Sequence, residues 1–254
     1  MDQHNLAARQ FGDTAANYLV SAVHATGADL DRVRELAQTL RPREALDLGC
    51  GAGHVSFALA RAGVPRVIAY DLSERMLAVV EQEARAKGYR AIEGCRGAAE
   101  QLPFQTSSFE LIVTRFSAHH WSSVSSALAQ VSRLLRPGGK FVVIDVFSPE
   151  SPLLDTTLQA LEVLRDMSHV RNYRLSEWYS MLDRCGLRQP SSQQWRLTLE
   201  FESWVRRIAT PERRIQALHA FMDDMPAEAK EYFALTAERS FQIDAAWIEV
   251  TKPT

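Results

Sequence analysis

The most constraining feature of the chain is a glycine-rich turn that follows a short apolar run. Residues 45–48 are apolar apart from Asp47, glycines stand at positions 49, 51 and 53, and apolar residues recur at helical spacing through 54–62. This order predicts a strand, a glycine turn and a helix. The bare backbone of such a turn, at the positive N-terminus of a helix, allows a ligand to approach closely.

The spacing of the turn indicates which ligand it suits. A dinucleotide fingerprint requires glycines at its first, third and sixth positions, whereas the sixth position here is His54. Asp47, two residues before the first glycine, would repel a pyrophosphate and attract an ammonium group. The next apolar run, 64–70, ends in Asp71, which is placed to accept hydrogen bonds from both hydroxyls of a ribose. The pattern therefore favours a nucleoside that carries an amino acid.

Further motifs follow the glycine turn in a fixed order. They are Asp71-Leu72-Ser73 with Met76, Glu100-Gln101-Leu102-Pro103-Phe104, Ser108-Phe109-Glu110-Leu111-Ile112-Val113, and Leu135-Arg136-Pro137-Gly138-Gly139-Lys140-Phe141. Over roughly residues 40–147, the chain resembles the class I S-adenosylmethionine-dependent methyltransferases. Within that class it is similar to the methyltransferase type 11 branch, which includes the ubiquinone and menaquinone C-methyltransferases.

The resemblance implies a three-layer, Rossmann-like α/β fold. Its seven-stranded sheet would have the order 3-2-1-4-5-7-6, with the seventh strand antiparallel and a helical cap outside the sheet. We expect a single methyltransferase domain over 1–254, because a chain of this length with 46% apolar residues can bury one large core. Residues 1–41 would form an N-terminal helical lid, 42–147 the cofactor-binding core, and 148–254 the acceptor cap with the last two strands.

The resemblance also implies that S-adenosyl-L-methionine is the cofactor and S-adenosyl-L-homocysteine the product. Family members often carry an acid that binds the adenine amino group one residue after a loop glycine, but here Gly97 is followed by Ala98 and Ala99. Backbone groups and apolar side chains would then hold the adenine. Arg115 either binds an anionic group or pairs with an acid such as Glu100. The expected cofactor-binding residues are Asp47, Gly49, Cys50, Gly51, Gly53, Asp71, Leu72, Met76, Ala98, Ala99, Glu100 and Arg115.

The segment 115–121, Arg-Phe-Ser-Ala-His-His-Trp, carries the most reactive side chains. It follows the fourth predicted strand, and in this fold the loop at the carboxyl end of that strand faces the transferable methyl group. His119 and His120 are candidates for a catalytic base or for acceptor binding, although either one can simply order the loop. Adjacent side chains rarely point the same way, so we expect at most one to face the acceptor. We favour His119, because His120 is nearer to the next helix start.

Other residues are expected around the acceptor. Tyr18 lies in the segment that forms a lid in the family, and it equally suits packing between two helices. The segment 169–173, which also recurs in the small-molecule branch, either borders the acceptor or is a solvated connector. The expected substrate-binding residues are Tyr18, Phe116, Trp121, His169, Arg171 and Tyr173.

These features predict methyl transfer to carbon, nitrogen or oxygen of a small aromatic, quinone-like or heterocyclic molecule. Alignment of the reacting atoms can supply on the order of 7–11 kcal/mol, and a base helps only when the acceptor must lose a proton. One alternative is a protein that uses the cofactor for cyclase or carboxyl-group chemistry. Another is a non-catalytic, cofactor-binding partner, against which the intact glycine turn and Asp71 argue.

The composition of the chain limits the partners that it can bind and the cell compartment in which we expect it. The net charge of −2 leaves no basic footprint for nucleic acid, and no apolar run approaches the ~18 residues of a membrane span. Cys50, Cys95 and Cys185 stand far apart, without zinc or disulfide spacing. We therefore expect an enzyme of the reducing cytoplasm that acts on a small molecule without a metal. Its oligomeric state is open.

Overall fold

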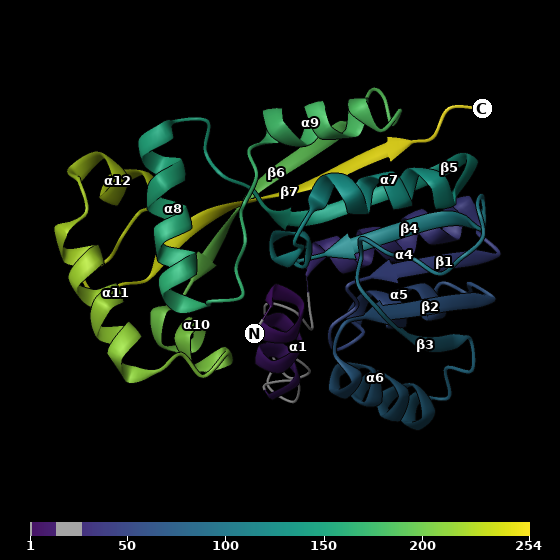
Figure 1. Ribbon diagram of the computed structural model, residues 1–254, viewed down its shortest axis with the longest axis horizontal. Coiled ribbons are helices and arrows are strands. Elements are labelled where there is room, and N and C mark those ends of the chain that lie inside the picture. Colours follow the sequence, from purple (N-terminus) through teal and green to yellow (C-terminus); the bar gives the residue numbers. More distant parts are fainter. Residues whose placement is uncertain (1, 14–26) are drawn as a thin grey trace.

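A computed structural model describes residues 2–13 and 27–254 and contains one mixed sheet of seven strands (Figure 1). The strand order β3-β2-β1-β4-β5-β7-β6 confirms the predicted topology. Strands β1 to β5 pair in parallel, and β7 runs antiparallel to both of its neighbours. The strands are β1 Glu44–Leu48, β2 Arg66–Asp71, β3 Ile92–Arg96, β4 Phe109–Arg115, β5 Leu135–Val146, β6 Ser191–Leu199 and β7 Phe241–Thr251.

Helices cover both faces of the sheet, because alternate residues of its central strands are apolar on both sides. In β1, Leu46 and Leu48 belong to a core shared with α7 and α9, whereas Ala45 belongs to a core shared with α4 and α5. The result is the expected three-layer arrangement. The helices of these layers are α4 Ala28–Leu40, α5 His54–Arg61, α6 Glu74–Lys87, α7 Val124–Leu134 and α9 Leu175–Arg184.

The remaining helices form a cap at one end of the sheet (Figure 1). They bury aromatic and aliphatic side chains, among them Trp204, Leu218 and Phe233, against Phe241 and Ile243 of β7. The long antiparallel strands therefore carry the cap beyond the parallel core. Its helices are α8 Pro152–Arg165, α10 Phe201–Arg207, α11 Glu212–Asp224 and α12 Ala227–Tyr232.

The strand that precedes α10 is shorter than its sequence suggests. The alternation of apolar and polar residues over 195–201 predicts a strand through Phe201, but β6 ends at Leu199. The Glu200 side chain accepts hydrogen bonds from the backbone N–H groups of Glu202 and Ser203 and so caps α10. This cap places Phe201 in a helix, where it is buried in the core of the cap.

The N-terminal helix α1, Gln3–Asp13, lies between the sheet and the cap helices (Figure 1). The Gln3 side chain donates a hydrogen bond to the Ser168 carbonyl at 2.5 Å, and the Gln10 side chain donates one to the Ile208 carbonyl at 2.7 Å. Ala7 is buried. The helix thus bridges the two parts of the chain, and the lid remains a prediction. Tyr18 lies outside the described residues.

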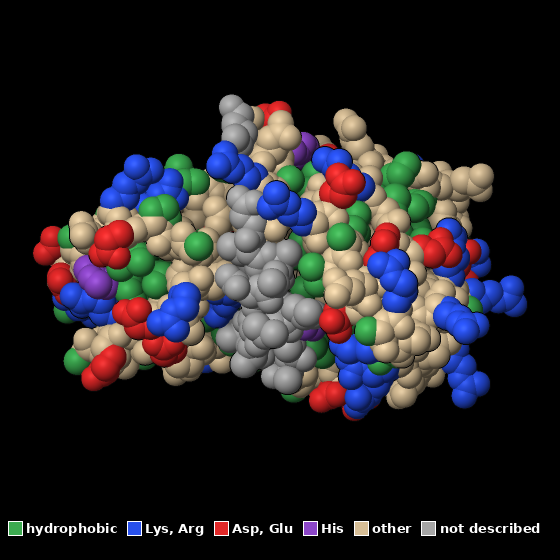
Figure 2. All heavy atoms as spheres, turned by 90° about the horizontal axis from the view of Figure 1, so that it is seen from below, with side chains coloured by type: hydrophobic (Ala, Val, Ile, Leu, Met, Phe, Trp, Pro, Cys, Tyr) green, Lys and Arg blue, Asp and Glu red, His purple; other side chains and the backbone are tan. Residues whose placement is uncertain are grey.

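Charged side chains of both signs are mixed on the face of the molecule in Figure 2, in keeping with the net charge of −2. Within residues 2–13 and 27–254, no helix is both long and apolar enough to cross a membrane.

Candidate functional site

The glycine turn between β1 and α5 has three left-handed residues, with φ of 74° at Gly49, 50° at Gly51 and 86° at Gly53. A Cβ on Gly49 would collide with the Ser117 side chain, and one on Gly53 would lie 2.9 Å from Val80. A Cβ on Gly51 would meet no other atom of the described residues within 4 Å. Protein packing therefore explains two of the glycines, whereas Gly51 borders open space.

Asp47, at the end of β1, is buried beneath this turn. Its Oδ2 accepts hydrogen bonds from the Ser56 backbone N–H at 2.8 Å and from the Ser56 hydroxyl at 2.6 Å. Burial raises the pKa of Asp47 to about 7, although the two bonds from Ser56 oppose the shift. The carboxyl group is thus held at the N-terminus of α5, and a cationic ligand group nearby would favour its charged form.

Asp71, at the end of β2, holds the turn from the other side. Its Oδ2 accepts a hydrogen bond from the Gly51 N–H at 2.9 Å, and its Oδ1 accepts one from the Ser73 N–H at 2.8 Å. Burial raises the pKa of Asp71, and these backbone bonds oppose the rise. The carboxylate is therefore fixed beside the open space at Gly51.

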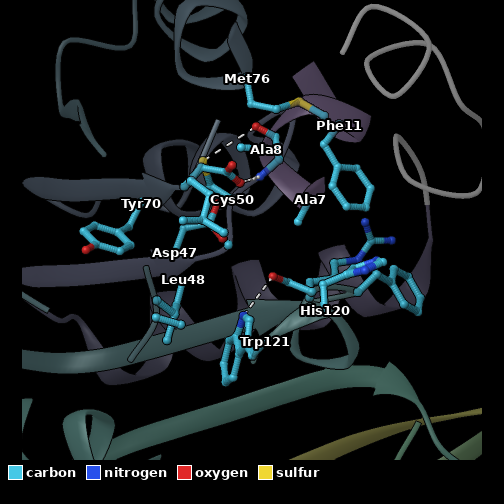
Figure 3. Close-up of a pocket in the computed structure, with 18 of the residues that line it drawn as sticks. Ala7, Ala8, Phe11, Asp47, Leu48, Cys50, Tyr70, Met76, His120 and Trp121 are labelled. Carbon is cyan, nitrogen blue, oxygen red and sulfur yellow. Dashed lines mark hydrogen bonds between the residues drawn. The ribbon is translucent and has the colours of Figure 1, made fainter. Parts of the chain in front are cut away.

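These groups line a first cavity of about 960 Å³, measured with its open mouth. Figure 3 shows Ala7 and Phe11 of α1 across this cavity from Asp47 and Leu48. The cavity brings together most residues predicted from sequence to bind the cofactor. They are Asp47, Gly49, Cys50, Gly51, Asp71, Leu72, Met76, Ala99, Glu100 and Arg115, joined by Phe116, His120 and Trp121.

Two predicted cofactor residues do not line the cavity. Gly53 packs against Val80 where α5 begins. The Ala98 carbonyl accepts a hydrogen bond from the Tyr70 hydroxyl at 3.3 Å, so it ties the loop to β2. The sequence also missed His4, Ala7, Ala8 and Phe11 of α1, which lie far along the chain from the glycine turn. Other missed lining residues stand within a few positions of predicted ones, and they are Leu48, Ala52, His54, Val55, Tyr70, Gly97 and Ser117.

Glu100 and Arg115 both line the first cavity, but they do not form the pair that was considered from sequence. Glu100 accepts a hydrogen bond from the Ser123 N–H at 3.0 Å, at the start of α7, and lies 3.4 Å from His4 Nε2. The Arg115 side chain is 6% exposed and pairs with Asp29 of α4 at 2.5 Å. The partner of Arg115 lies in a different layer of the fold, which no local pattern indicates.

A second cavity of about 520 Å³, also measured with its open mouth, adjoins the first. The two share Phe11, Phe116 and His120 in their linings, and they therefore meet at these side chains. Phe116 has a φ of 49°, a left-handed conformation that costs a bulky residue about 1–3 kcal/mol and is typical of functional sites. The other lining residues are His119, Val146, Glu162, Arg165, Leu197, Leu199, Trp204, Arg207 and Ile243.

Both histidines of the pair line the second cavity, although adjacent side chains were expected to point in different directions. They lie on a 3₁₀ turn, Ala118–His120, in which successive side chains are only about 120° apart. Their ring centroids are 4.2 Å apart. His120 alone of the two also lines the first cavity. The two rings share a cavity because this part of the loop is helical rather than extended.

The two histidines have different partners and opposite pKa shifts. His119 Nδ1 lies 2.6 Å from Asp145 Oδ1, whereas His120 Nδ1 lies 3.0 Å from the Ser168 carbonyl. Burial disfavours the charged form of His119, but the charge and hydrogen bond of Asp145 outweigh it and raise the His119 pKa. Burial, reinforced by His119, lowers the pKa of His120 to about 4. Near neutral pH, His120 is therefore an uncharged imidazole.

The segment 169–173 contacts the histidine turn through backbone hydrogen bonds. The backbone N–H groups of Val170 and Arg171 both donate to the His119 carbonyl. His169 is buried, its Nε2 lies 3.0 Å from Gln159 Oε1, and burial lowers its pKa to about 2. Arg171 pairs with Asp155 at 2.9 Å. These partners explain why His169 and Arg171 line neither cavity.

Tyr173, the third predicted residue of that segment, packs against Trp178 of α9 with ring centroids 6.2 Å apart. It lines neither cavity. Trp121, in contrast, borders the first cavity, where its indole N–H donates to the Ser117 hydroxyl at 3.3 Å (Figure 3). Within the described residues, no cluster of histidine, cysteine and acidic side chains is arranged to hold a metal ion.

Comparison with known proteins places this chain and its fold among methyltransferases. Residues 46–143 match the model of a methyltransferase domain. The uncharacterized protein YafE of Escherichia coli is 41% identical over 204 residues, which are 80% of this chain and 98% of that protein. The uncharacterized methyltransferase YcgJ of Bacillus subtilis is 34% identical over 232 residues, 91% of this chain and 91% of that protein. Its crystal structure has a TM-score of 0.82 at 33% identity and covers 88% of this chain and 99% of that chain.

A shorter stretch of the chain is similar to an enzyme whose name gives its substrate. The demethylmenaquinone methyltransferase of Lactococcus lactis is 32% identical over 110 residues, which are 42% of this chain and 44% of that enzyme. More distant structures of the same fold were crystallised with S-adenosyl-L-methionine or S-adenosylhomocysteine.

Proposed function

The chain belongs to the methyltransferase family and is an S-adenosyl-L-methionine-dependent methyltransferase, and we propose that its acceptor is a small, partly apolar molecule bound in the second cavity. The observation that carries this proposal is the shared boundary of the two cavities at Phe11, Phe116 and His120. A molecule in the second cavity would meet the cofactor at that boundary.

The first cavity suits the cofactor. A ligand can occupy the open space beside Gly51, with the fixed Asp71 carboxylate next to it. We assign Asp71 to the ribose hydroxyls, Asp47 and the glycine turn to the amino-acid end, and Leu72 with Met76 to the adenine. Bound there, S-adenosyl-L-methionine supplies a methyl group already activated by its positive sulfur. The protein then has mainly to align the acceptor and to exclude water.

Cofactor binding should depend strongly on Asp71. We expect Asp71→Ala to weaken S-adenosyl-L-methionine binding by roughly 2–4 kcal/mol, because two charge-assisted hydrogen bonds to the ribose are lost. The Gly51 N–H would lose its acceptor as well. Isothermal titration calorimetry measures the change. Glu74→Ala is the matched control, since this exposed acid at the start of α6 pairs only with Arg96 among the ion pairs of the described residues. Unchanged affinity in Asp71→Ala would remove the ribose assignment.

The second cavity indicates the class of acceptor. Seven aromatic and aliphatic side chains of the described residues line it together with five polar groups, which are His119, His120, Glu162, Arg165 and Arg207. Such a lining suits a ring with a few polar substituents. The demethylmenaquinone methyltransferase relative is named for a quinone substrate. We therefore place the acceptor among small aromatic, quinone-like or heterocyclic molecules methylated at carbon, nitrogen or oxygen. A cytoplasmic location fits the three free cysteines.

Filling the second cavity tests this assignment. We expect Leu199→Trp to lower kcat/KM for the acceptor by roughly 10–200-fold, as the larger side chain takes the space of the acceptor. Cofactor affinity should stay unchanged. The assay offers labelled methyl donor to a panel of phenols, hydroquinones and nitrogen heterocycles and measures S-adenosylhomocysteine release. Leu235→Trp, also in the cap but outside both cavities, is the control. Undiminished transfer by Leu199→Trp would place the acceptor elsewhere.

A further inference from the structure

Asp145 is the only charged residue in the apolar run 141–147 of β5 and the segment after it. It is 4% exposed, and both of its oxygens are held by the backbone. Its Oδ1 accepts a hydrogen bond from the Val146 N–H at 2.8 Å, and its Oδ2 accepts one from the Ala118 N–H at 3.0 Å. A carboxylate fixed in this way cannot turn from its third partner, which is His119 Nδ1 at 2.6 Å.

The contact with Asp145 determines which nitrogen of the His119 ring carries the hydrogen. A charged carboxylate only accepts hydrogen bonds, so Nδ1 carries the hydrogen and the neutral ring has its lone pair on Nε2. Because His119 lines the second cavity, Nε2 is the nitrogen with which it can accept a proton there. Among the three clustered histidines, His120 contacts a neutral carbonyl and His169 contacts a glutamine amide. Of these three histidines, His119 alone is bonded to an acid among the described residues.

We propose that Asp145 is a positioning residue that makes His119 Nε2 the proton acceptor of the reaction, and that the methyl acceptor is therefore a molecule with an ionisable O–H, N–H or C–H group. The substrate class of this inference rests on the proposed function. The assignment of Asp145 rests on the geometry alone.

The step balances without any further reactant. The acceptor gives its proton to Nε2 of His119, and the electron pair left on the acceptor forms the new bond to the methyl carbon. The bond between methyl and sulfur breaks with its electrons on sulfur, which becomes neutral. The imidazolium is stabilised by Asp145 and later releases its proton to water. This sequence is the usual use of a histidine held by a buried carboxylate.

Other charged groups surround the ring and enter its pH dependence. The carboxyls of Glu162 and Asp166 favour the imidazolium, as Asp145 does, whereas burial opposes it. The groups that face the histidine cluster are Asp145 on β5, His120 on the 3₁₀ turn, Glu162 and Arg165 on α8, Asp166, His169 and Arg171 after it, and Arg207 on α10. Removing the charge of Asp145 should therefore lower the His119 pKa while the other acids stay in place.

Histidine NMR titration of the full chain tests this without any acceptor. The His119 signal is assigned from its loss in His119→Gln. We expect His119 to titrate above the ordinary 6.5 in the natural protein, and Asp145→Asn to increase its acid dissociation constant tenfold or more. Asp244→Asn is the control, because this acid of β7 bonds Arg196 and Tyr232 instead. An unchanged His119 titration in Asp145→Asn would overturn the proposal.

The kinetic arm separates this inference from the proposed function. For a protic acceptor, Asp145→Asn should lower kcat by about 10²–10⁴-fold with little change in the acceptor KM. The acidic limb of its pH profile should move to lower pH. Methyl transfer by the natural protein tests the proposed function. The NMR titration and the kinetics of Asp145→Asn test whether His119 is the base. Normal kcat and an unshifted pH profile in Asp145→Asn would reduce Asp145 to a structural role and overturn the inference.

Discussion

Replacing Gly51 with valine is expected to abolish S-adenosyl-L-methionine binding while unfolding stays cooperative. A Cβ at this position meets no other atom of the described residues within 4 Å, so protein packing does not forbid it. It would instead project into the space next to the Asp71 carboxylate and the Asp47 end of the cavity. Calorimetric titration with the cofactor should then show no measurable heat of binding.

The φ of 50° at Gly51 adds a second effect that must be separated from the first. A side chain in left-handed conformation costs roughly 1–2 kcal/mol of stability wherever it occurs. Gly88 provides the matched control, because its φ is 73° and a Cβ there also meets no described atom within 4 Å. It ends α6, away from the cavity. Gly88→Val should lose similar stability and keep its affinity. If Gly51→Val also binds the cofactor, the glycine turn does not hold it.

The first cavity could be predicted in large part because its motifs are local. The glycine turn and Asp71 belong to one strand–helix–strand unit, and the structure joins them by the hydrogen bond from the Gly51 N–H to Asp71. The same applies to the sheet, whose parallel strands alternate with helices along the chain. Periodicity and turn chemistry act over a few residues, so these features can be recognised without knowledge of the fold.

The partners supplied by distant segments could not be predicted in this way. Arg115 pairs with Asp29 rather than with a nearby acid, and α1 brings Phe11 to the boundary of both cavities. Arg171 has the chemistry of a binding residue, yet it pairs with Asp155 and lines neither cavity. Asp145 did leave a signal, since a lone acid in a buried apolar strand needs a partner. Its partner is His119, which only the fold reveals.

His119 and His120 should have different roles, His119 as the base and His120 as part of the cavity wall. We expect His119→Ala to lower turnover of a protic acceptor by about 10²–10⁴-fold and to leave cofactor affinity nearly intact. The neutral ring is the active form, so turnover of the natural enzyme should rise with pH through the raised pKa of His119, with a midpoint above 6.5. His119→Ala should lose that rise. Steady-state assays over pH 5.5–9 measure both effects.

His120→Ala should behave differently, because His120 lines both cavities and its pKa is lowered to about 4. A group that is already uncharged at pH 5.5 contributes no titration over the assayed range. Its removal should raise the acceptor KM, since the boundary of the two cavities loses a ring, and should keep the rise of turnover with pH. If His120→Ala loses that rise and His119→Ala keeps it, the base is His120. If His119→Ala and His120→Ala both turn over the acceptor as fast as the natural protein, the histidine turn is excluded from catalysis. Neither ring would then touch the reacting proton.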